Sequence, residues 1–174
     1  MNWYKKATKE KCSGWIAVRF NSSISKKVQD WGKKHIPNED VYTKDDHGRE
    51  TDTHITVVYG LCTEDHKIVK QILSGTKPIK ATMKKVGFFK NSDDFDVVIV
   101  KMESKDLEDL NKKINYSLTV DTNHPEYKPH CTISYVKNGK AAAYGGDTFF
   151  DGTKITFNKV VFVDNKGKET EISL

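Results

Sequence analysis

One six-residue pattern occurs twice in this chain, each time inside a short apolar segment. Residues 54–60 read HITVVYG and residues 130–136 read HCTISYV, so each copy is His-x-Thr-x-x-Tyr. β-Branched and aromatic residues dominate both segments, which is typical of strands. Each copy also follows a polar, turn-prone stretch, at 43–53 and at 121–129. The repeat therefore predicts two equivalent strands, one in each half of the chain.

The segments around these two strands alternate between strand and helix patterns. We expect the strands at 14–20, 54–60, 79–89, 94–102, 130–136, 154–164 and 168–174. We expect the helices at 22–36, from 63 to before Gly75, and at 104–115. The predicted N-caps are Ser22 or Ser23, then Thr63, then Ser104, and Pro37 should end the first helix.

This order of elements predicts an α+β fold with helices packed outside mainly antiparallel sheets. No Pro- or Gly-rich linker divides the chain, and each half leads through a polar loop into a His-x-Thr strand. With 174 residues, 36% of them hydrophobic, the chain can bury one core. We therefore expect residues 1–174 to form a single two-lobed, pseudo-symmetric domain.

The composition indicates where the protein is located and which partners it can bind. No segment approaches the roughly 20 apolar residues of a membrane helix, and the N-terminus lacks a secretory pattern, so we expect a cytoplasmic protein with no membrane partner. The cysteines, Cys12, Cys62 and Cys131, are few and widely spaced, which favours reduced thiols. The net charge of +5 comes almost entirely from lysine, which makes a phosphate-bearing partner plausible.

Strand alternation divides each motif into two faces. In the first copy His54, Thr56 and Val58 share one face, and Ile55, Val57 and Tyr59 share the other. The second copy places His130, Thr132 and Ser134 opposite Cys131, Ile133 and Tyr135. The second set of each copy is apolar enough to be buried. Each strand should therefore present an imidazole and a hydroxyl side by side on its polar face.

Two imidazoles and two hydroxyls around one cleft suit phosphodiester cleavage. One neutral imidazole takes a proton from the attacking oxygen, and a second, protonated imidazole gives one to the leaving oxygen. The hydroxyls of Thr56 and Thr132 donate hydrogen bonds to the non-bridging phosphate oxygens. This chemistry needs no metal. We therefore predict His54, Thr56, His130 and Thr132 as catalytic residues.

The pair His54-Ile55-Thr56 and His130-Cys131-Thr132 resembles the 2H phosphoesterase superfamily. The resemblance implies two His-x-Thr motifs on facing strands of a pseudo-twofold, LigT-like fold, with a cleft between the lobes and metal-free cleavage of phosphodiesters. The flanking segments GWIAVRF, ISKKVQDW, ETDTHITVVYGL and YKPHCTISYV look most like phage-encoded anti-CBASS phosphodiesterases. That branch implies a cyclic oligonucleotide substrate, 3′–5′ hydrolysis and a location in the host cytoplasm.

A cyclic oligonucleotide needs rings that stack on its bases and cations near its phosphates. Alternation buries one of Phe88 and Phe89, and we expect Phe89 to contact substrate. We also expect Tyr127, Lys128 and Arg49 to contact substrate, since they stand in the loops that lead into the motifs. Tyr127 equally suits a role in bracing its loop, and charged loop residues are common.

No metal site or cofactor is predicted. The other histidines, His35, His47, His66 and His124, match no metal-ligand spacing, and we expect them at the surface. The glycines lack the Gly-Lys-Ser/Thr pattern of a phosphate-binding loop.

The leading hypothesis is a metal-independent phosphodiesterase that hydrolyses 3′–5′ bonds of cyclic di- or trinucleotide immune signals. The same four residues also suit RNA 2′,3′-cyclic phosphates, although the arginine-poor surface favours this less. A non-catalytic cyclic-nucleotide sponge is the alternative from another class, and no protein partner is implied. The sequence leaves open which histidine is the base and whether water or a ribose 2′-hydroxyl attacks first.

Overall fold

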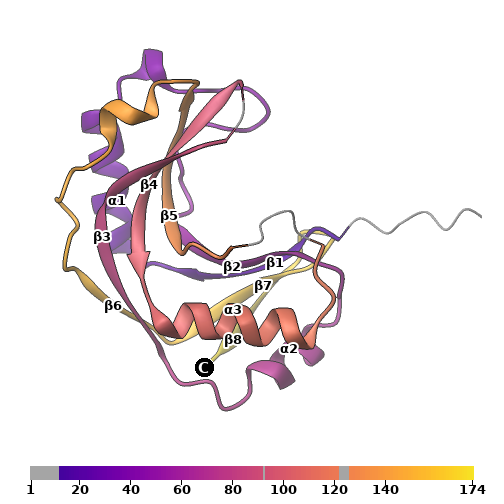
Figure 1. Cartoon of the computed structure of the whole chain (residues 1–174). Coiled ribbons are helices and arrows are strands. Elements are labelled where there is room, and N and C mark those ends of the chain that lie inside the picture. Colours follow the sequence, from indigo (N-terminus) through magenta and orange to yellow (C-terminus); the bar gives the residue numbers. More distant parts are fainter. Residues whose placement is uncertain (1–11, 92, 122–125) are drawn as a thin grey trace, which may run out of the picture.

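The computed structural model of the chain describes residues 12–91, 93–121 and 126–174, and Figure 1 shows its architecture. The strands are β1 (Gly14–Arg19), β2 (His54–Leu61), β3 (Ile79–Lys90), β4 (Phe95–Glu103), β5 (His130–Lys137), β6 (Lys154–Phe157), β7 (Lys159–Val163) and β8 (Glu169–Ser173). The helices are α1 (Ser22–His35), α2 (His66–Leu73) and α3 (Lys105–Ser117), with short 3-10 turns η1 (Asn38–Asp40) and η2 (Ala141–Tyr144).

The strands form two four-stranded sheets, and every strand pair in them is antiparallel. The first sheet has the order β2-β1-β7-β8 and the second has the order β5-β4-β3-β6. Each His-x-Thr strand therefore lies at the edge of its own sheet, and the two edges, β2 and β5, contact each other. This arrangement confirms the predicted α+β class and its two similar lobes.

The helices pack on the outer sides of the two sheets (Figure 1). α1 contacts β5, and α3 contacts β2 and β3. Gly32 of α1 lies so near β5 that a Cβ on it would come within 2.8 Å of Ile133 Cγ2. The buried apolar side chains of both sheets and all three helices form one cluster. None of the helices in the described part of the chain is long and apolar enough to cross a membrane.

The helix ends confirm one predicted cap and correct two. Ser104 caps α3, as predicted, by accepting the Leu107 N–H. α1 is capped by Asn21, because its carboxamide reaches the Ile24 N–H at 3.0 Å. α2 is capped by Asp65, which is a stronger N-cap than the predicted Thr63. The Asp65 carboxylate accepts the Lys67 N–H at 2.8 Å. α1 ends before Pro37, as predicted.

The predicted strand at 154–164 is wrong as a single element. The chain leaves the second sheet after β6 and enters the first sheet as β7, with Asn158 between them. Asn158 and Lys159 are both exposed, so the period-two burial pattern breaks there. The crossing joins the two lobes, and the two adjacent polar residues, Asn158 and Lys159, are the sequence signal for it.

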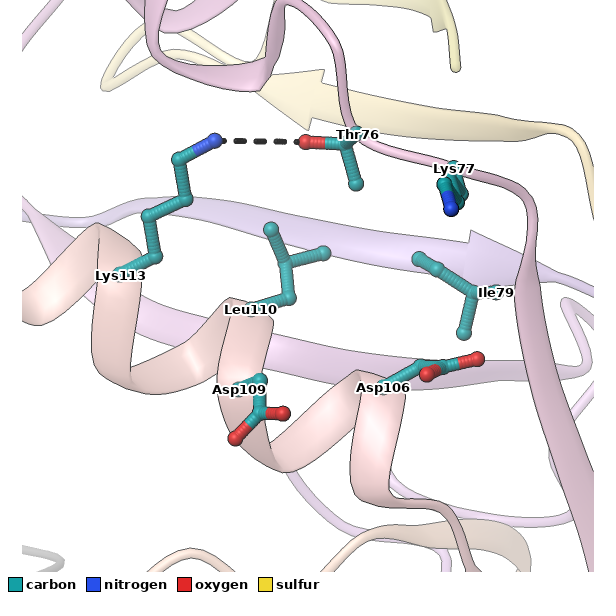
Figure 2. Close-up of a pocket in the computed structure, with 7 residues that line it drawn as sticks. All are labelled: Thr76, Lys77, Ile79, Asp106, Asp109, Leu110 and Lys113. Atoms are coloured by element: carbon teal, nitrogen blue, oxygen red, sulfur yellow. Dashed lines mark hydrogen bonds between the residues drawn. The ribbon is translucent and has the colours of Figure 1, made fainter.

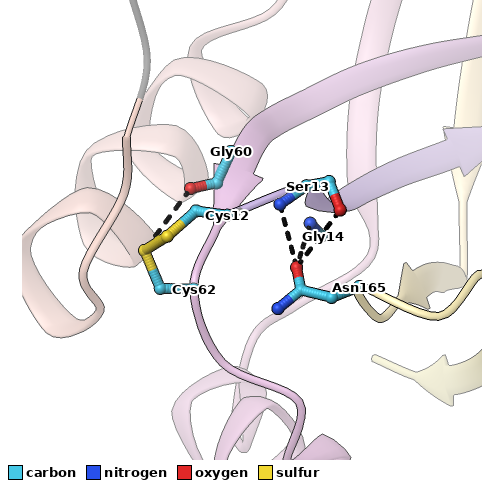
Figure 3. Close-up of a disulfide and its surroundings, with 6 residues drawn as sticks. All are labelled: Cys12, Ser13, Gly14, Gly60, Cys62 and Asn165. Atoms are coloured by element: carbon cyan, nitrogen blue, oxygen red, sulfur yellow. Dashed lines mark hydrogen bonds between the residues drawn. A yellow bond between two sulfur atoms is a disulfide. The ribbon is translucent and has the colours of Figure 1, made fainter. Parts of the chain in front are cut away.

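The prediction of reduced thiols is also wrong for two of the three cysteines. Cys12, just before β1, forms a disulfide with Cys62, just after β2 (Figure 3). The reason is the register of β1 on β2, which pairs Gly14 with Leu61 and so brings the two flanking cysteines together. Cys131 remains a free, buried thiol, and burial raises its pKa. The disulfide fastens one end of the first lobe.

Candidate active site

The two motif strands share an irregularity that the sequence did not predict. β1 pairs Ile16 with Val58 and Ala17 with Thr56, so Val57 is an extra residue in β2. β4 pairs Val98 with Ser134 and Ile99 with Thr132, so Ile133 is an extra residue in β5. Both bulges stand three residues after the motif histidine. The repeat is therefore one of backbone geometry as well as of residue types.

Each bulge resets the alternation of side chains along its strand. Val57 and Val58 are both buried, at 0% and 5% exposure, and Ser134 is 0% exposed. Tyr59 lies opposite Trp15, on the face that carries Thr56, and is 55% exposed. The predicted faces are therefore wrong beyond the threonines, because a bulge shifts the pleat by one residue.

The same reset occurs in β5, where Tyr135 pairs with Val97 and Thr132 pairs with Ile99. Val97 and Ile99 share one face of β4, so Tyr135 joins the face of His130 and Thr132. The predicted burial of both motif tyrosines is therefore corrected. Each motif places a histidine, a threonine and a tyrosine on one face.

The backbone groups at the bulges are hydrogen-bonded to neighbouring elements. Asn111 of α3 donates its side-chain N–H to the Val57 carbonyl at 2.7 Å. The Glu50 N–H donates to the Ile133 carbonyl at 2.9 Å. These bonds satisfy carbonyls that the strand ladder leaves unpaired, so they hold each bulge in place.

The two motif histidines are held in the same way. Nδ1 of His54 lies 2.5 Å from the Asp52 carbonyl, and Nδ1 of His130 lies 2.7 Å from the Lys128 carbonyl. A carbonyl oxygen only accepts, so Nδ1 carries the proton in both rings. In the neutral form each ring therefore has its lone pair at Nε2. Both side chains are partly exposed.

A contact between the loops brings the two motifs together. Tyr127, three residues before His130, donates its hydroxyl proton to the Thr56 carbonyl at 3.0 Å. Burial raises the pKa of this hydroxyl, so it remains a donor at neutral pH. The residue that leads into the second motif is thus fastened to the first motif.

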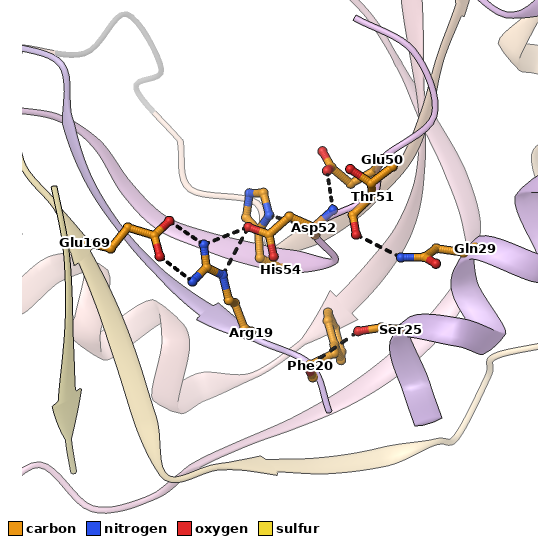
Figure 4. Close-up of polar contacts among 9 residues, drawn as sticks. All are labelled: Arg19, Phe20, Ser25, Gln29, Glu50, Thr51, Asp52, His54 and Glu169. Carbon is orange, nitrogen blue, oxygen red and sulfur yellow. Dashed lines mark hydrogen bonds and ion pairs between the residues drawn. The ribbon is translucent and has the colours of Figure 1, made fainter. Parts of the chain in front are cut away.

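Charged side chains next to His54 form ion pairs with one another. Arg19 lies opposite His54 in the β1–β2 register and donates from Nε and Nη2 to Asp52, at 3.0 and 2.8 Å. The same guanidinium donates to both carboxylate oxygens of Glu169 (Figure 4). The hydrogen bond from Arg19 lowers the pKa of Glu169, and the two carboxylates raise the pKa of Arg19. The Trp15 ring lies 5.5 Å from the imidazole.

An aromatic ring and an open cleft lie next to His130. The Phe89 ring meets the imidazole edge-on, with the ring centroids 4.9 Å apart. Beside it lies a cleft of about 560 Å³. Its lining residues come from β3, β4, α3 and the loop before β5: Phe88, Phe89, Ile99, Lys101, Met102, Glu108, Tyr127, Lys128 and Pro129. Three of the four predicted substrate-binding residues thus meet at one cleft.

The fourth, Arg49, is not brought to this cleft. Its guanidinium donates to the carbonyls of Gly32 and Ile36 and to Asn38 Oδ1, at 2.6–2.9 Å. Arg49 therefore caps the C-terminal end of α1, where a cation interacts favourably with the helix dipole. Lys128 forms an ion pair with Glu126 at 3.0 Å. Tyr127 fills the bracing role described above while its ring lines the cleft.

Lys101 and Glu108 also line the cleft and were missed by sequence reasoning. Lys101 lies in the apolar run of β4, and its place opposite His130 depends on the pairing of β4 with β5. Glu108 follows the helical period of α3 as an ordinary polar position. Neither residue carries a local sequence signal. Lys101 is placed by strand pairing within the second sheet, and Glu108 reaches the cleft through the packing of α3 against β3.

The other histidines that the structure describes do not line this cleft. His35 is exposed and stacks on Trp31, and His66 is exposed at the start of α2. His47 corrects the surface prediction, because it is half-buried against the rings of Tyr135 and Phe95. His124 lies outside the described residues. Among residues that are described, no three His, Cys, Asp or Glu side chains gather as a metal site.

A second depression, of about 240 Å³, lies between α3 and the segment before β3 (Figure 2). Lys113 donates to Thr76 across it at 3.5 Å, and Asp106 accepts the Lys80 N–H. None of the predicted site residues lines it. It belongs to the packing of α3 against the segment that leads into β3.

Residues 13–164 match the family described as anti-CBASS protein Acb1. The chain belongs to the anti-CBASS Acb1 family. The match includes both His-x-Thr strands and all the residues that line the cleft beside His130. Membership of the Acb1 family agrees with the resemblance that the flanking segments gave. A comparison with curated proteins gives no match.

Solved structures with the same fold are remote in sequence. Escherichia coli LigT complexed with 3′-AMP has 15% identity and a TM-score of 0.62, with 95% of this chain and 96% of LigT covered. TT0787 of Thermus thermophilus has 13% identity and the same TM-score, with 93% and 94% covered. Kluyveromyces marxianus Usb1 has 8% identity and a TM-score of 0.59, with 94% and 99% covered. These likenesses confirm the 2H phosphoesterase fold.

Proposed function

We propose that this Acb1-family protein is a metal-independent phosphodiesterase that hydrolyses 3′–5′ bonds of cyclic di- and trinucleotide immune signals. Such an activity removes the signals on which CBASS defence depends. One observation carries the proposal: two histidines on contacting edge strands have Nδ1 fixed by the carbonyl two residues earlier, which puts the lone pair of each neutral ring at Nε2. Family membership supports the biological setting.

The proposed chemistry divides the proton transfers between the two lobes. Nε2 of one neutral histidine takes the proton from the attacking water or ribose hydroxyl as its oxygen bonds to phosphorus. Nε2 of the other, protonated, histidine donates to the departing ribose oxygen as its bond to phosphorus breaks. The hydroxyls of Thr56 and Thr132 donate to the non-bridging oxygens, where negative charge is redistributed.

The cleft beside His130 is the proposed place for a base and its phosphate. Phe89 and Tyr127 supply aromatic surface, and Lys128 supplies positive charge at the rim. Base–aromatic stacking contributes about 1–3 kcal/mol per base, which is enough to orient one nucleotide. The solved LigT structure is a complex with 3′-AMP. By analogy of fold, this supports a nucleotide ligand for the present protein.

The decisive test is cleavage of a substrate panel by purified protein, with products identified by mass. The panel contains cyclic dinucleotides, cyclic trinucleotides and RNA ending in a 2′,3′-cyclic phosphate. We expect linear products from the cyclic nucleotides, with rates unchanged by EDTA. Cleavage of the RNA alone would identify an RNA-end enzyme, and loss of activity with EDTA would contradict the metal-free mechanism.

A matched pair of variants separates an enzyme from a sponge. His54→Ala should abolish cleavage, whereas His66→Ala, at an exposed position at the start of α2, should leave it intact. Each variant is then expressed at equal level in bacteria that carry CBASS and are challenged with phage. If His54→Ala still protects the phage fully, the protein acts by sequestration.

A further inference from the structure

A basic residue lies directly opposite each motif histidine on the neighbouring strand. The β1–β2 register pairs Arg19 with His54, and the β4–β5 register pairs Lys101 with His130. Directly opposite residues of an antiparallel pair point to the same face, with Cβ atoms about 4.5–5.5 Å apart. Each histidine therefore has a cationic side chain rooted beside it.

These two cations differ in their partners. The Arg19 guanidinium is bound by both Asp52 and Glu169, so its charge is neutralised within the protein. Lys101 forms no ion pair with any carboxylate of residues 12–91, 93–121 and 126–174. Glu108 lines the same cleft but forms no ion pair with Lys101. Of the two cations that the strand registers pair with a motif histidine, Lys101 is therefore the one that the described protein leaves unneutralised.

A glycine fixes the path of the Lys101 side chain. A Cβ on Gly87 would lie 2.5 Å from Lys101 Cε, 3.2 Å from its Cγ and 3.3 Å from its Cδ. The lysine stem thus lies flat on β3, in space that any other residue at position 87 would occupy. Glycine inside a strand often marks such a close approach.

The strand registers show where this stem leads. Gly87 pairs with Ile99, and Ile99 pairs with Thr132, so these three residues form one row across the second sheet. The stem of Lys101 leaves β4 toward β3, on the side away from β5, and crosses from the row of His130 into the row of Thr132. Its end thereby lies over β3, on the face of the sheet that also carries His130 and Thr132, and the side chain lines the cleft.

We propose that Lys101 binds a phosphate oxygen of the substrate, and that Gly87 is present to let its side chain lie in the cleft. The inference rests on the proposed phosphodiesterase function and adds a residue outside both motifs. An ammonium donates up to three hydrogen bonds and suits a phosphate as a point charge. Because the counterpart cation, Arg19, is neutralised, the substrate's charge is drawn toward the second lobe.

The test compares three variants with a charge-matched control. Lys101→Met keeps the stem and removes the charge, Lys101→Arg keeps the charge, and Gly87→Ala displaces the stem. Lys154→Met removes one exposed lysine from the edge strand β6, which does not line the cleft. For each protein, KM and kcat for a cyclic dinucleotide are measured from low to high salt, and binding is measured separately by calorimetry with a non-hydrolysable phosphorothioate analogue.

We expect Lys101→Met to raise KM and the analogue's Kd by about 10- to 100-fold, as for loss of one charge-assisted hydrogen bond. The slope of log(kcat/KM) against log[salt] should fall by about one. Lys101→Arg should recover most of the affinity, and Lys154→Met should behave as wild type. Affinity and salt slope within twofold of wild type in Lys101→Met would overturn the inference.

Gly87→Ala tests the path of the stem independently of the charge. It should weaken binding in the wild-type background and have no further effect in the Lys101→Met background, because the two residues act through one contact. Additive effects would contradict the role given to Gly87. Failure of wild-type protein to bind or cleave any cyclic nucleotide would instead remove the proposed function itself, so the two failures are distinguishable.

Discussion

The two motif strands, β2 and β5, have the same backbone and different neighbours. Both lie at sheet edges, both bulge three residues after the histidine, and both hold Nδ1 on the carbonyl two residues earlier. Around β2 the charges are paired by Arg19, and a disulfide fastens the strand end. Around β5 there is an aromatic cleft with an unneutralised lysine among the described residues.

The comparison separates what the chemistry requires from what the substrate requires. Proton transfer needs two similar imidazoles, and the shared features fix both rings in the same tautomer. A substrate is bound in one orientation, and the unshared features differ: ion pairs neutralise the charges around β2, whereas β5 adjoins an aromatic cleft that also contains Lys101. The lobes should therefore respond alike to changes in the motifs and differently to changes around them.

The largest expected effect is the loss of either motif histidine. His54→Ala and His130→Ala should each lower kcat for a cyclic dinucleotide by about 10³-fold, since positioned acid–base groups contribute 10²–10⁴-fold. Steady-state kinetics with His66→Ala as control measures this. A loss of less than tenfold in one variant and a complete loss in the other would break the proposed equivalence of the lobes.

Loss of either threonine hydroxyl should have the next largest effect. Thr56→Val and Thr132→Val keep the shape and remove the donor, so we expect kcat to fall about 10²-fold with little change in KM. Thr→Ser at each position keeps the hydroxyl and should retain most activity. A threonine that tolerates valine would show that its lobe does not contact the phosphate.

The disulfide should make the stability of the protein sensitive to reductant. It closes a loop of 50 residues between Cys12 and Cys62, and such crosslinks typically contribute about 2–4 kcal/mol. Dithiothreitol should therefore lower the free energy of unfolding of wild type by that amount, measured by urea denaturation. The Cys12→Ser/Cys62→Ser variant should already be at the lower value and be insensitive. Equal sensitivity in both proteins would contradict the bond.

The smallest expected effect concerns the ion pairs beside His54. Arg19 lowers the pKa of Glu169 below its usual 4.5, so the pair stabilises the native state above that pH and the contribution is lost as pH falls through the lowered value. Glu169→Gln should thus cost at most about 1 kcal/mol at pH 7, and the cost should disappear in acid as pH falls through the lowered pKa. A cost that persists in acid would mean that the carboxylate charge is irrelevant.

The sequence predicted the parts of the site that local patterns encode. The fold class, the order of elements, the Ser104 cap and the two His-x-Thr strands all follow from hydrophobic period and capping residues. Tyr127 and Lys128 stand next to the second motif in the chain, and Phe89 was predicted from the alternation of its own strand. Features of this kind depend on neighbours in sequence.

The features that the sequence missed depend on pairing between distant segments. The bulges at Val57 and Ile133 need the registers of β2 and β5, and their effect on Tyr59 and Tyr135 follows from those registers alone. The Cys12–Cys62 bond needs the pairing of β1 with β2, and the place of Lys101 needs that of β4 with β5. The sequence predicted that Arg49 contacts substrate. Its hydrogen bonds to the end of α1 also join segments that are apart in the chain, so local patterns did not indicate them.

The most direct test of the central claim is a double-mutant cycle on the two histidines. If both imidazoles serve one phosphate, His54→Ala/His130→Ala should be about as slow as either single variant, because residues that act as a unit are strongly non-additive. Cleavage of one cyclic dinucleotide is measured for all four proteins. Single losses that multiply in the double variant, to about 10⁶-fold, would show that the lobes act independently and would contradict a shared site.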